Sequence, residues 1–148
     1  MGSINKLRAA LGATFVSVAV ASTLTVSQPA NAAAAYDSLA EGDLCVTGYT
    51  CLWDFVMRQS SGVGFYNDAW NFASIPSSYR WIENRAISGQ NHTGGSNVTK
   101  LYRDAGGAGT SRCLKAGQYD SDFNNDSFAE RASALVWSSS CGSVTVFR

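Results

Sequence analysis

Four cysteines are the residues with the clearest chemistry in this 148-residue chain: Cys45, Cys51, Cys113 and Cys141. They do not resemble a zinc site, because no C-x-x-C pair is present and the chain has one histidine. An even number of cysteines instead suggests two disulfides. Three pairings are open; Cys45–Cys51 with Cys113–Cys141 is favoured because the first two can close a loop across a turn at Gly48. Loop-closure entropy then gives about 2.4 and about 3.6 kcal/mol of stabilisation.

An acidic segment is the second candidate for chemistry. Carboxylate and amide oxygens alternate at Asp120, Asp122, Asn124 and Asp126, which suits a hard cation such as calcium. An EF-hand loop would need glycine at its sixth position and glutamate at its twelfth, but asparagine and Arg131 stand there. The remaining interpretations are a calcium site of another kind and an ordinary acidic surface loop. We therefore expect no required cofactor, with calcium as the one candidate.

Catalytic groups are scarce. His92 is the single histidine, and it lies among glycine, asparagine and threonine, where a solvated side chain is the usual finding. The HExxH, GxSxG and P-loop motifs are missing from the sequence. A pair of carboxylates assembled by folding would leave no spacing signal. We nevertheless expect a protein that is not an enzyme.

Four tryptophans are many for a chain of this length, and we expect some of them in the core, since a small domain needs their area. Trp70, Tyr79 and Trp81 lie in a polar stretch. These three could form an exposed aromatic surface that contacts a sugar or a protein.

The N-terminus has the order of a secretory signal. Lys6 and Arg8 precede an apolar stretch over 9–26, and a small-residue run follows, which places cleavage after Ala32. We expect a signal peptide at 1–32, a flexible leader at 33–43 and one domain at 44–148. The protein would then be extracellular and free of the membrane after cleavage.

The charge of the expected mature chain is small. Of the 11 Lys and Arg side chains, Lys6 and Arg8 fall in the signal, so nine remain against 11 Asp and Glu. No basic patch typical of nucleic-acid or membrane binding remains. We expect a monomer that binds neither.

Short segments rich in aromatic and β-branched residues alternate with Gly, Ser and Asn, which is typical of a sandwich or barrel. The expected strands cover 50–56, 64–66, 98–102, 112–114, 135–137 and 144–147, with a helical turn in 74–81. The chain also resembles itself: Trp53 and Tyr102 are 49 residues apart, and Asn84 and Glu130 are 46 apart. Two such units, about 44–96 and 97–148, predict paired Greek keys.

These features resemble a known family. C-x5-C at Cys45–Cys51 is followed by Leu-Trp, then come LYRDAGGAG and CLKAG, and the units close with NRAIS and ERASA. Over residues 44–137 the chain is similar to secreted bacterial βγ-crystallin-like proteins grouped as a metalloproteinase-inhibitor family. The resemblance implies an all-β sandwich of two Greek-key motifs, stapled by disulfides, and in some members inhibition of extracellular metallopeptidases.

The chain departs from that family in two places. The best-understood inhibitor of this type presents its scissile segment on a loop held by a second short-range cysteine pair in mid-chain, but here no cysteine lies between Cys51 and Cys113. The inhibitory loop is therefore unknown, and 90–99 would be a long, flexible candidate. The family's calcium motif is degraded at 83–88 and 129–134, so we expect Arg85-Ala86 and Arg131-Ala132 to be structural.

Three functions follow as hypotheses. The leading one is a secreted, non-enzymatic inhibitor of an extracellular peptidase. The second is a crystallin-like antifungal toxin or a module that binds cell-wall polysaccharide through the aromatic residues. The third is a structural protein stabilised by calcium.

Overall fold

The computed structural model describes residues 35–148, so the expected signal peptide at 1–32 lies outside the described residues. Short strands, joined by turns and single turns of 3-10 helix, make up this part of the chain, as the dense turn residues predict. The elements are β1 (Tyr36–Leu39), β2 (Tyr49–Trp53), η1 (Val56–Arg58), β3 (Gly62–Phe65), η2 (Phe72–Ser74), η3 (Arg80–Ile82), β4 (Ser88–His92), β5 (Val98–Asp104), β6 (Ala108–Leu114), β7 (Tyr119–Asp120), η4 (Phe123–Asp126) and β8 (Ala134–Ser138). None of these helices is long and apolar enough to cross a membrane.

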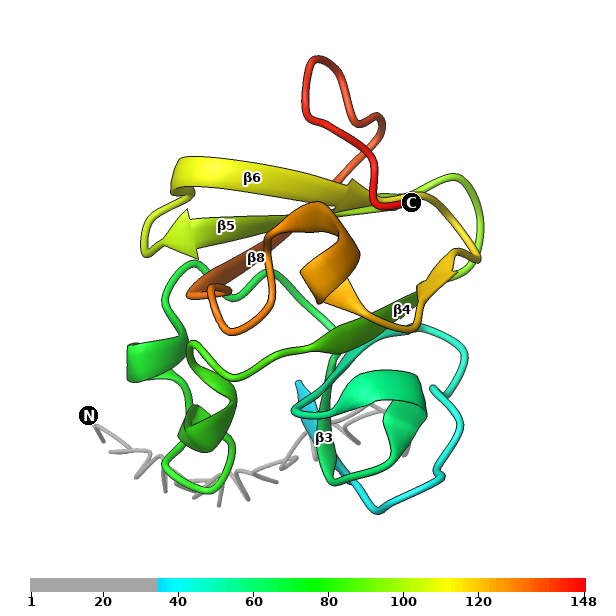
Figure 1. The fold of residues 1–148 in the computed structure, drawn as a ribbon, viewed down its shortest axis with the longest axis vertical. Helices are drawn as coiled ribbons and strands as arrows, with labels where there is room; N and C mark the ends of the chain where they lie inside the picture. Colours follow the sequence, from blue (N-terminus) through cyan, green and yellow to red (C-terminus); the bar gives the residue numbers. More distant parts are fainter. Residues whose placement is uncertain (1–34) are drawn as a thin grey trace, which may run out of the picture. The chain divides into compact units, whose positions relative to one another are not determined.

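Two antiparallel sheets contain the strands. The first has the order β1-β3-β2-β4-β7 and the second the order β6-β5-β8, which lies in the upper half of Figure 1. The all-β fold expected from the sequence is confirmed. Expected strands at 50–56, 64–66, 98–102, 112–114 and 135–137 correspond to β2, β3, β5, β6 and β8, with shifted ends.

The two sequence units, about 44–96 and 97–148, share some local features and exchange parts. β5 follows β2 at the spacing of the sequence repeat, and Asn71 and Asp122 each cap a 3-10 helix with their side chains. β7 of the second half pairs with β4 in the first sheet. Ala69 of the first half bridges to Leu135 of β8 in the second sheet, through two backbone hydrogen bonds of 2.8 Å. Each half therefore completes the sheet of the other.

The main core consists of apolar side chains drawn from both sheets and from the 3-10 helices. Its largest fully buried members are Phe65, Phe72, Phe123, Phe128, Leu52, Ile82, Leu101, Leu114 and Leu135. Alternation along β2 sends Leu52 into this core, while Trp53 and Cys51 enter a second, smaller cluster with Leu39 and Cys45. β2 is thus buried on both faces, which fixes its register firmly.

Disulfides join Cys45 to Cys51 and Cys113 to Cys141, with Cα–Cα distances of 5.7 and 5.8 Å. This is the pairing that loop length favours, and it is confirmed.

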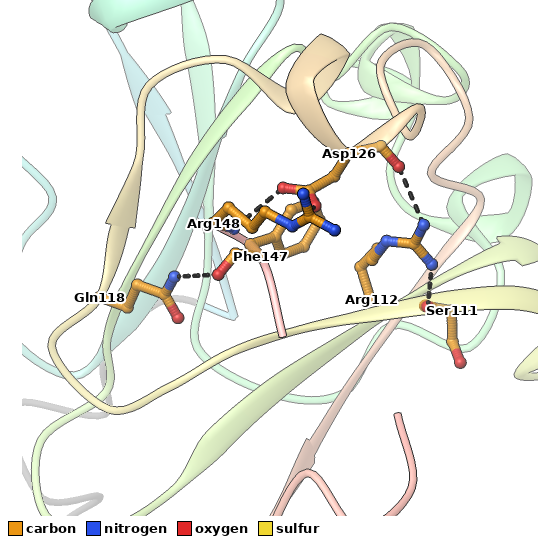
Figure 2. A network of polar contacts seen from close by, with 6 residues as sticks. All are labelled: Ser111, Arg112, Gln118, Asp126, Phe147 and Arg148. Atoms are coloured by element: carbon orange, nitrogen blue, oxygen red, sulfur yellow. Dashed lines mark hydrogen bonds and ion pairs between the residues drawn. The ribbon is translucent and has the colours of Figure 1, made fainter. Parts of the chain in front are cut away.

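The C-terminal segment, expected as a strand at 144–147, forms one bridge only, between Val146 and Cys113. It returns to the end of β6 (Figure 1) and is held there by side chains. Phe147 stacks on Phe123 with ring centroids 4.3 Å apart. Gln118 donates to the Phe147 carbonyl at 2.8 Å, and Asp126 accepts from the Arg148 backbone N–H at 2.9 Å (Figure 2). The segment is thus anchored by one buried ring and polar contacts instead of by a sheet.

Two segments expected to be flexible contain strands. Within the expected leader at 33–43, β1 pairs with β3, because Tyr36 packs against Phe65 and stacks on Tyr79. Within the expected loop at 90–99, β4 runs to His92 and the chain is in a strand again from Val98.

The helical turn expected in 74–81 is also displaced. η2 ends at Ser74 and η3 begins at Arg80, and between them Tyr79 donates its backbone N–H to the Pro76 carbonyl at 2.9 Å. The segment is therefore a turn between two short helices.

Candidate functional site

The segment 42–48, which we call the Cys45 loop, leads into β2 and carries the first disulfide. Cys45 and Cys51 are 4% and 0% exposed, so the bridge lies inside the smaller apolar cluster. The residues on either side of Cys45 are turned outwards: Leu44 is 70% exposed and Val46 is 53% exposed. A buried anchor therefore carries an apolar residue on each side of it at the surface.

Hydrogen bonds fix the backbone of this loop at several points. Gly42 donates its N–H to the Arg58 carbonyl at 3.0 Å, and Gly48 donates to the His92 carbonyl at 2.8 Å. The His92 Nδ1–H donates to the Cys45 carbonyl at 2.7 Å. A carbonyl can only accept, so the proton of the neutral imidazole is on Nδ1. Besides its disulfide, the loop is therefore held by two neighbouring elements, the end of η1 at Arg58 and the end of β4 at His92.

More apolar surface lies beside the loop. Tyr66 is 38% exposed, and its ring stands 3.4 Å from the position that a Cβ on Gly48 would take. Phe55 and Met57 are 50% and 62% exposed and lie on the segment that the Gly42 hydrogen bond ties to the loop. Exposed apolar side chains that lie side by side, as Tyr66 does with the loop at Gly48, are typical of a contact surface.

Sequence reasoning missed this site. Leu44 and Val46 flank a cysteine in the sequence. Their exposure depends on the burial of Cys45, which the sequence does not show. His92, expected to be a solvated loop residue, lies instead at the end of β4 and is partly buried. The C-x5-C spacing with Gly48 between was the signal that could have indicated a constrained loop.

The three aromatic residues predicted as a contact surface have different surroundings. Tyr79 stacks on Tyr36 with ring centroids 5.5 Å apart, and Trp81 is half-buried against the main core with the Arg85 guanidinium 5.8 Å from its ring. Trp70 is 51% exposed and lies by the turn between β5 and β6, where its carbonyl accepts from the Gly106 N–H. Within residues 35–148 no ring contact joins Trp70 to the other two.

The acidic segment begins in β7 and continues into η4. Asp122 Oδ1 accepts from the backbone N–H and side-chain amide of Asn124, at 3.0 and 2.6 Å. Asp126 accepts from the Arg148 backbone. Asp120 is 2% exposed; its Oδ1 accepts from the Asp122 N–H at 2.9 Å, while Oδ2 is buried without a partner.

Burial raises the pKa of the Asp120 carboxyl above its usual range, and the negative charges of Asp126 and Asp122 raise it further. The hydrogen bond from the Asp122 N–H opposes this shift. In the described part of the chain no cluster of three or more His, Cys, Asp or Glu side chains is arranged to hold a metal ion. Calcium binding at this segment stays a prediction.

The two degraded calcium-motif stretches face each other. Asn84 and Glu130 both adopt positive φ, 55° and 56°. Asn84 donates its backbone N–H to the Ala132 carbonyl, and Glu130 donates to that of Ala86, each at 2.9 Å. Ala86 and Ala132 are fully buried, so their role here is to pack the core.

Comparison with known proteins identifies the fold. No family model and no curated protein matches the chain. Among solved structures, the chain is similar to one from work on the evolution of the eye lens βγ-crystallin domain fold, with a TM-score of 0.58 and 14% identity over 70% of this chain and 96% of that one. It is also similar to spherulin 3A of Physarum polycephalum, with a TM-score of 0.51 and 13% identity over 71% of this chain and 95% of that one.

These similarities show a βγ-crystallin fold of two Greek keys, as the sequence resemblance implies. At such identities they are evidence of fold alone. No comparison matches a metalloproteinase-inhibitor family.

Proposed function

We propose that this protein is a secreted, non-enzymatic inhibitor of an extracellular peptidase and that the Cys45 loop is its inhibitory segment. The observation that carries the proposal is the exposure of Leu44 and Val46, 70% and 53%, on the two sides of a disulfide-bonded cysteine that is 4% exposed. Apolar side chains in this position can enter the pockets of a peptidase cleft while the buried anchor resists their displacement.

Rigidity is the physical reason to prefer this loop. Fixing one residue of a mobile loop costs about 1–2 kcal/mol of backbone entropy, which a flexible peptide loses when it binds. The Cys45 loop loses this backbone entropy when the protein folds, because the disulfide and the hydrogen bonds of Gly42, Cys45 and Gly48 already fix its conformation. Preorganisation of this kind raises affinity without adding contacts.

The segment 90–99, the candidate from the sequence, is less suitable. Its first residues are strand β4, and the turn after β4 is tied down by Asn91, which is fully buried. Asn91 donates to the carbonyl of Asn97 at 2.8 Å and accepts from the Thr93 hydroxyl at 2.8 Å. No large exposed apolar side chain lies on this turn.

Two features of the chain support the secretion that the proposal requires. The N-terminal segment has the order of a cleaved secretory signal, and both disulfides would persist in an oxidising compartment. The choice of a metallopeptidase as the target rests on the family resemblance, since an apolar loop would suit any peptidase with apolar pockets.

Titration of a zinc peptidase such as thermolysin with the purified protein tests the proposal. We expect activity to fall in proportion to added protein, with one inhibitor bound per enzyme. Leu44→Asp and Val46→Asp should each weaken inhibition by at least about 100-fold, because a desolvated charge would enter an apolar pocket. The Cys45→Ser/Cys51→Ser double variant should weaken it as well while the domain stays folded.

Trp70→Asp is the matched control, since Trp70 is an apolar residue about as exposed as Val46, 51% against 53%, and lies by a different turn. Inhibition by this variant should equal that of the unchanged protein. The proposal is overturned if a panel of serine, cysteine and zinc peptidases shows neither inhibition nor complex formation, or if the Leu44 and Val46 variants inhibit as well as the control.

Calcium stabilisation is a second candidate function, favoured by the buried, unpartnered Oδ2 of Asp120 beside two further acids. Titration calorimetry with calcium chloride tests it. We expect binding heat and a raised Tm in excess calcium, both lost in Asp122→Ala. If calcium gives no heat and leaves Tm unchanged, this function is wrong, whatever the peptidase assay shows.

A further inference from the structure

A groove separate from the Cys45 loop lies where β1 ends, β2 leads into the next turn and β3 begins. Its volume is about 360 Å³, at the lower end of the range for small-molecule sites. The residues that line it are Ser38, Leu39, Asp54, Ser61, Gly62 and Trp81. None of them belongs to the Cys45 loop, so a ligand in this groove would bind whether or not that loop inhibits a peptidase.

Trp81 supplies the apolar wall of the groove. It is the middle residue of η3, and it is half-buried because part of its side chain packs against the main core. The packing holds the ring in one orientation, while the rest of it lines the groove. A fixed indole gives a flat apolar surface at little cost in side-chain entropy on binding.

An ion pair supplies the polar wall. The Arg85 Nη2 donates to Asp54 Oδ2 at 2.8 Å, and the side chain of Asp54 is only 17% exposed. The same guanidinium lies 5.8 Å from the Trp81 ring, so it links the carboxylate to the indole. Asp54 Oδ1 accepts no hydrogen bond within residues 35–148 and is available to a ligand. The hydroxyls of Ser38 and Ser61 add groups that can both donate and accept.

This combination selects a class of ligand. Arg85 balances the charge of Asp54, so the groove has no net charge to attract an ion. A purely apolar ligand would leave the carboxylate and the two hydroxyls desolvated and unpaired, which costs about 1–3 kcal/mol for each group. A sugar ring has apolar C–H faces that can lie on an indole and hydroxyls at its edge that can bond to carboxylate and serine oxygens.

We propose that the groove at Trp81 and Asp54 binds a neutral saccharide. The ring lies against Trp81, and its hydroxyls donate to Asp54 Oδ1 and exchange hydrogen bonds with Ser38 and Ser61. A polysaccharide of a cell surface would hold the protein there, while the Cys45 loop remains free for another partner. The exposed Trp70 takes no part, because it lies by the turn between β5 and β6.

The test is titration calorimetry and tryptophan fluorescence of the intact protein with chitotetraose, cellotetraose, laminaritetraose and mannotetraose. We expect at least one of them to bind with a micromolar to millimolar Kd and to change the fluorescence of Trp81. Asp54→Ala and Trp81→Ala should each raise Kd by about tenfold or more, which corresponds to about 1.4 kcal/mol. Trp70→Ala and Leu44→Asp should leave Kd unchanged.

Trp81→Ala removes a core contact and could unfold the domain, so a second variant fills the groove instead. Ser61 is exposed at its edge, and Ser61→Tyr should abolish binding without lowering Tm. The proposal is overturned if none of the four oligosaccharides binds. It is also overturned if Ser61→Tyr and Asp54→Ala bind as the unchanged protein does, or if Trp70→Ala weakens binding to the same extent.

Discussion

Replacement of Phe147 by alanine measures how much the C-terminal segment contributes to stability. Phe147 is 3% exposed, stacks on Phe123 at 4.3 Å and meets Phe128 edge to face at 5.6 Å. Truncation of a phenylalanine in such a position costs about 3–5 kcal/mol, from lost burial and from the cavity that remains. In a folded part of this size, 1 kcal/mol lowers Tm by about 4 °C. Phe147→Ala should therefore lower Tm by about 12–20 °C.

Thermal and urea unfolding followed by circular dichroism provide the assay. Arg148→Ala is the control, because it removes a side chain that is 83% exposed and an ion pair of 3.8 Å, but keeps the backbone N–H that donates to Asp126. It should cost at most about 0.5 kcal/mol. If the free energy of unfolding of Phe147→Ala is within about 1 kcal/mol of that of the unchanged protein, the C-terminal segment does not contribute to the core and the reasoning is refuted.

Two further predictions concern buried polar groups. Thr50→Val should cost about 2–3 kcal/mol in urea unfolding and Thr99→Val about 1 kcal/mol, since Thr50 Oγ1 contacts Thr99 Oγ1 at 2.6 Å and also accepts from Trp137 Nε1 at 3.0 Å; equal costs would show that the indole bond contributes nothing. Asp120→Asn should raise Tm at pH 7 and give less gain as the pH falls. Folding raises the pKa of Asp120, so its ionised form opposes folding above that pKa and protonation removes the penalty; a gain in Tm that grows towards acid pH would contradict this.

The strands that the sequence predicts best are those with an internal hydrophobic pattern. Over β2, Leu52 and Trp53 lie between turn residues and next to a cysteine, and both faces of the strand are buried. The repeat spacing then helps, since the same order of elements returns from Val98. Local pattern and tertiary structure agree at these positions, as expected for a minimally frustrated chain.

β4 shows why the rest could not be predicted. Its sequence, Ser-Gly-Gln-Asn-His, has no apolar residue, and it is a strand because it pairs with β2 on one side and β7 on the other. Asn91 is fully buried and donates to the Leu114 carbonyl at 3.2 Å. A strand stabilised by neighbours from distant parts of the chain carries little signal of its own.

The candidate site likewise has features that the sequence predicts and features that depend on tertiary packing. The spacing of Cys45 and Cys51 predicts a closed loop, since the distance along the chain sets the loop length. The outward position of Leu44 and the hydrogen bond from His92 depend on packing against β4, which the sequence did not indicate. In the groove, Asp54 and Trp81 come from separate elements and have no common spacing to detect.

The exchange of β7 and Ala69 between the halves has a consequence for how the molecule comes apart. A single Greek key expressed alone would lack a strand partner that the other half supplies, so its sheet would expose unpaired backbone groups at that edge. Loss of order in either half therefore removes hydrogen-bonding partners from the other, and the two should melt together. A partly opened form that peptidases could cleave is then rarely populated.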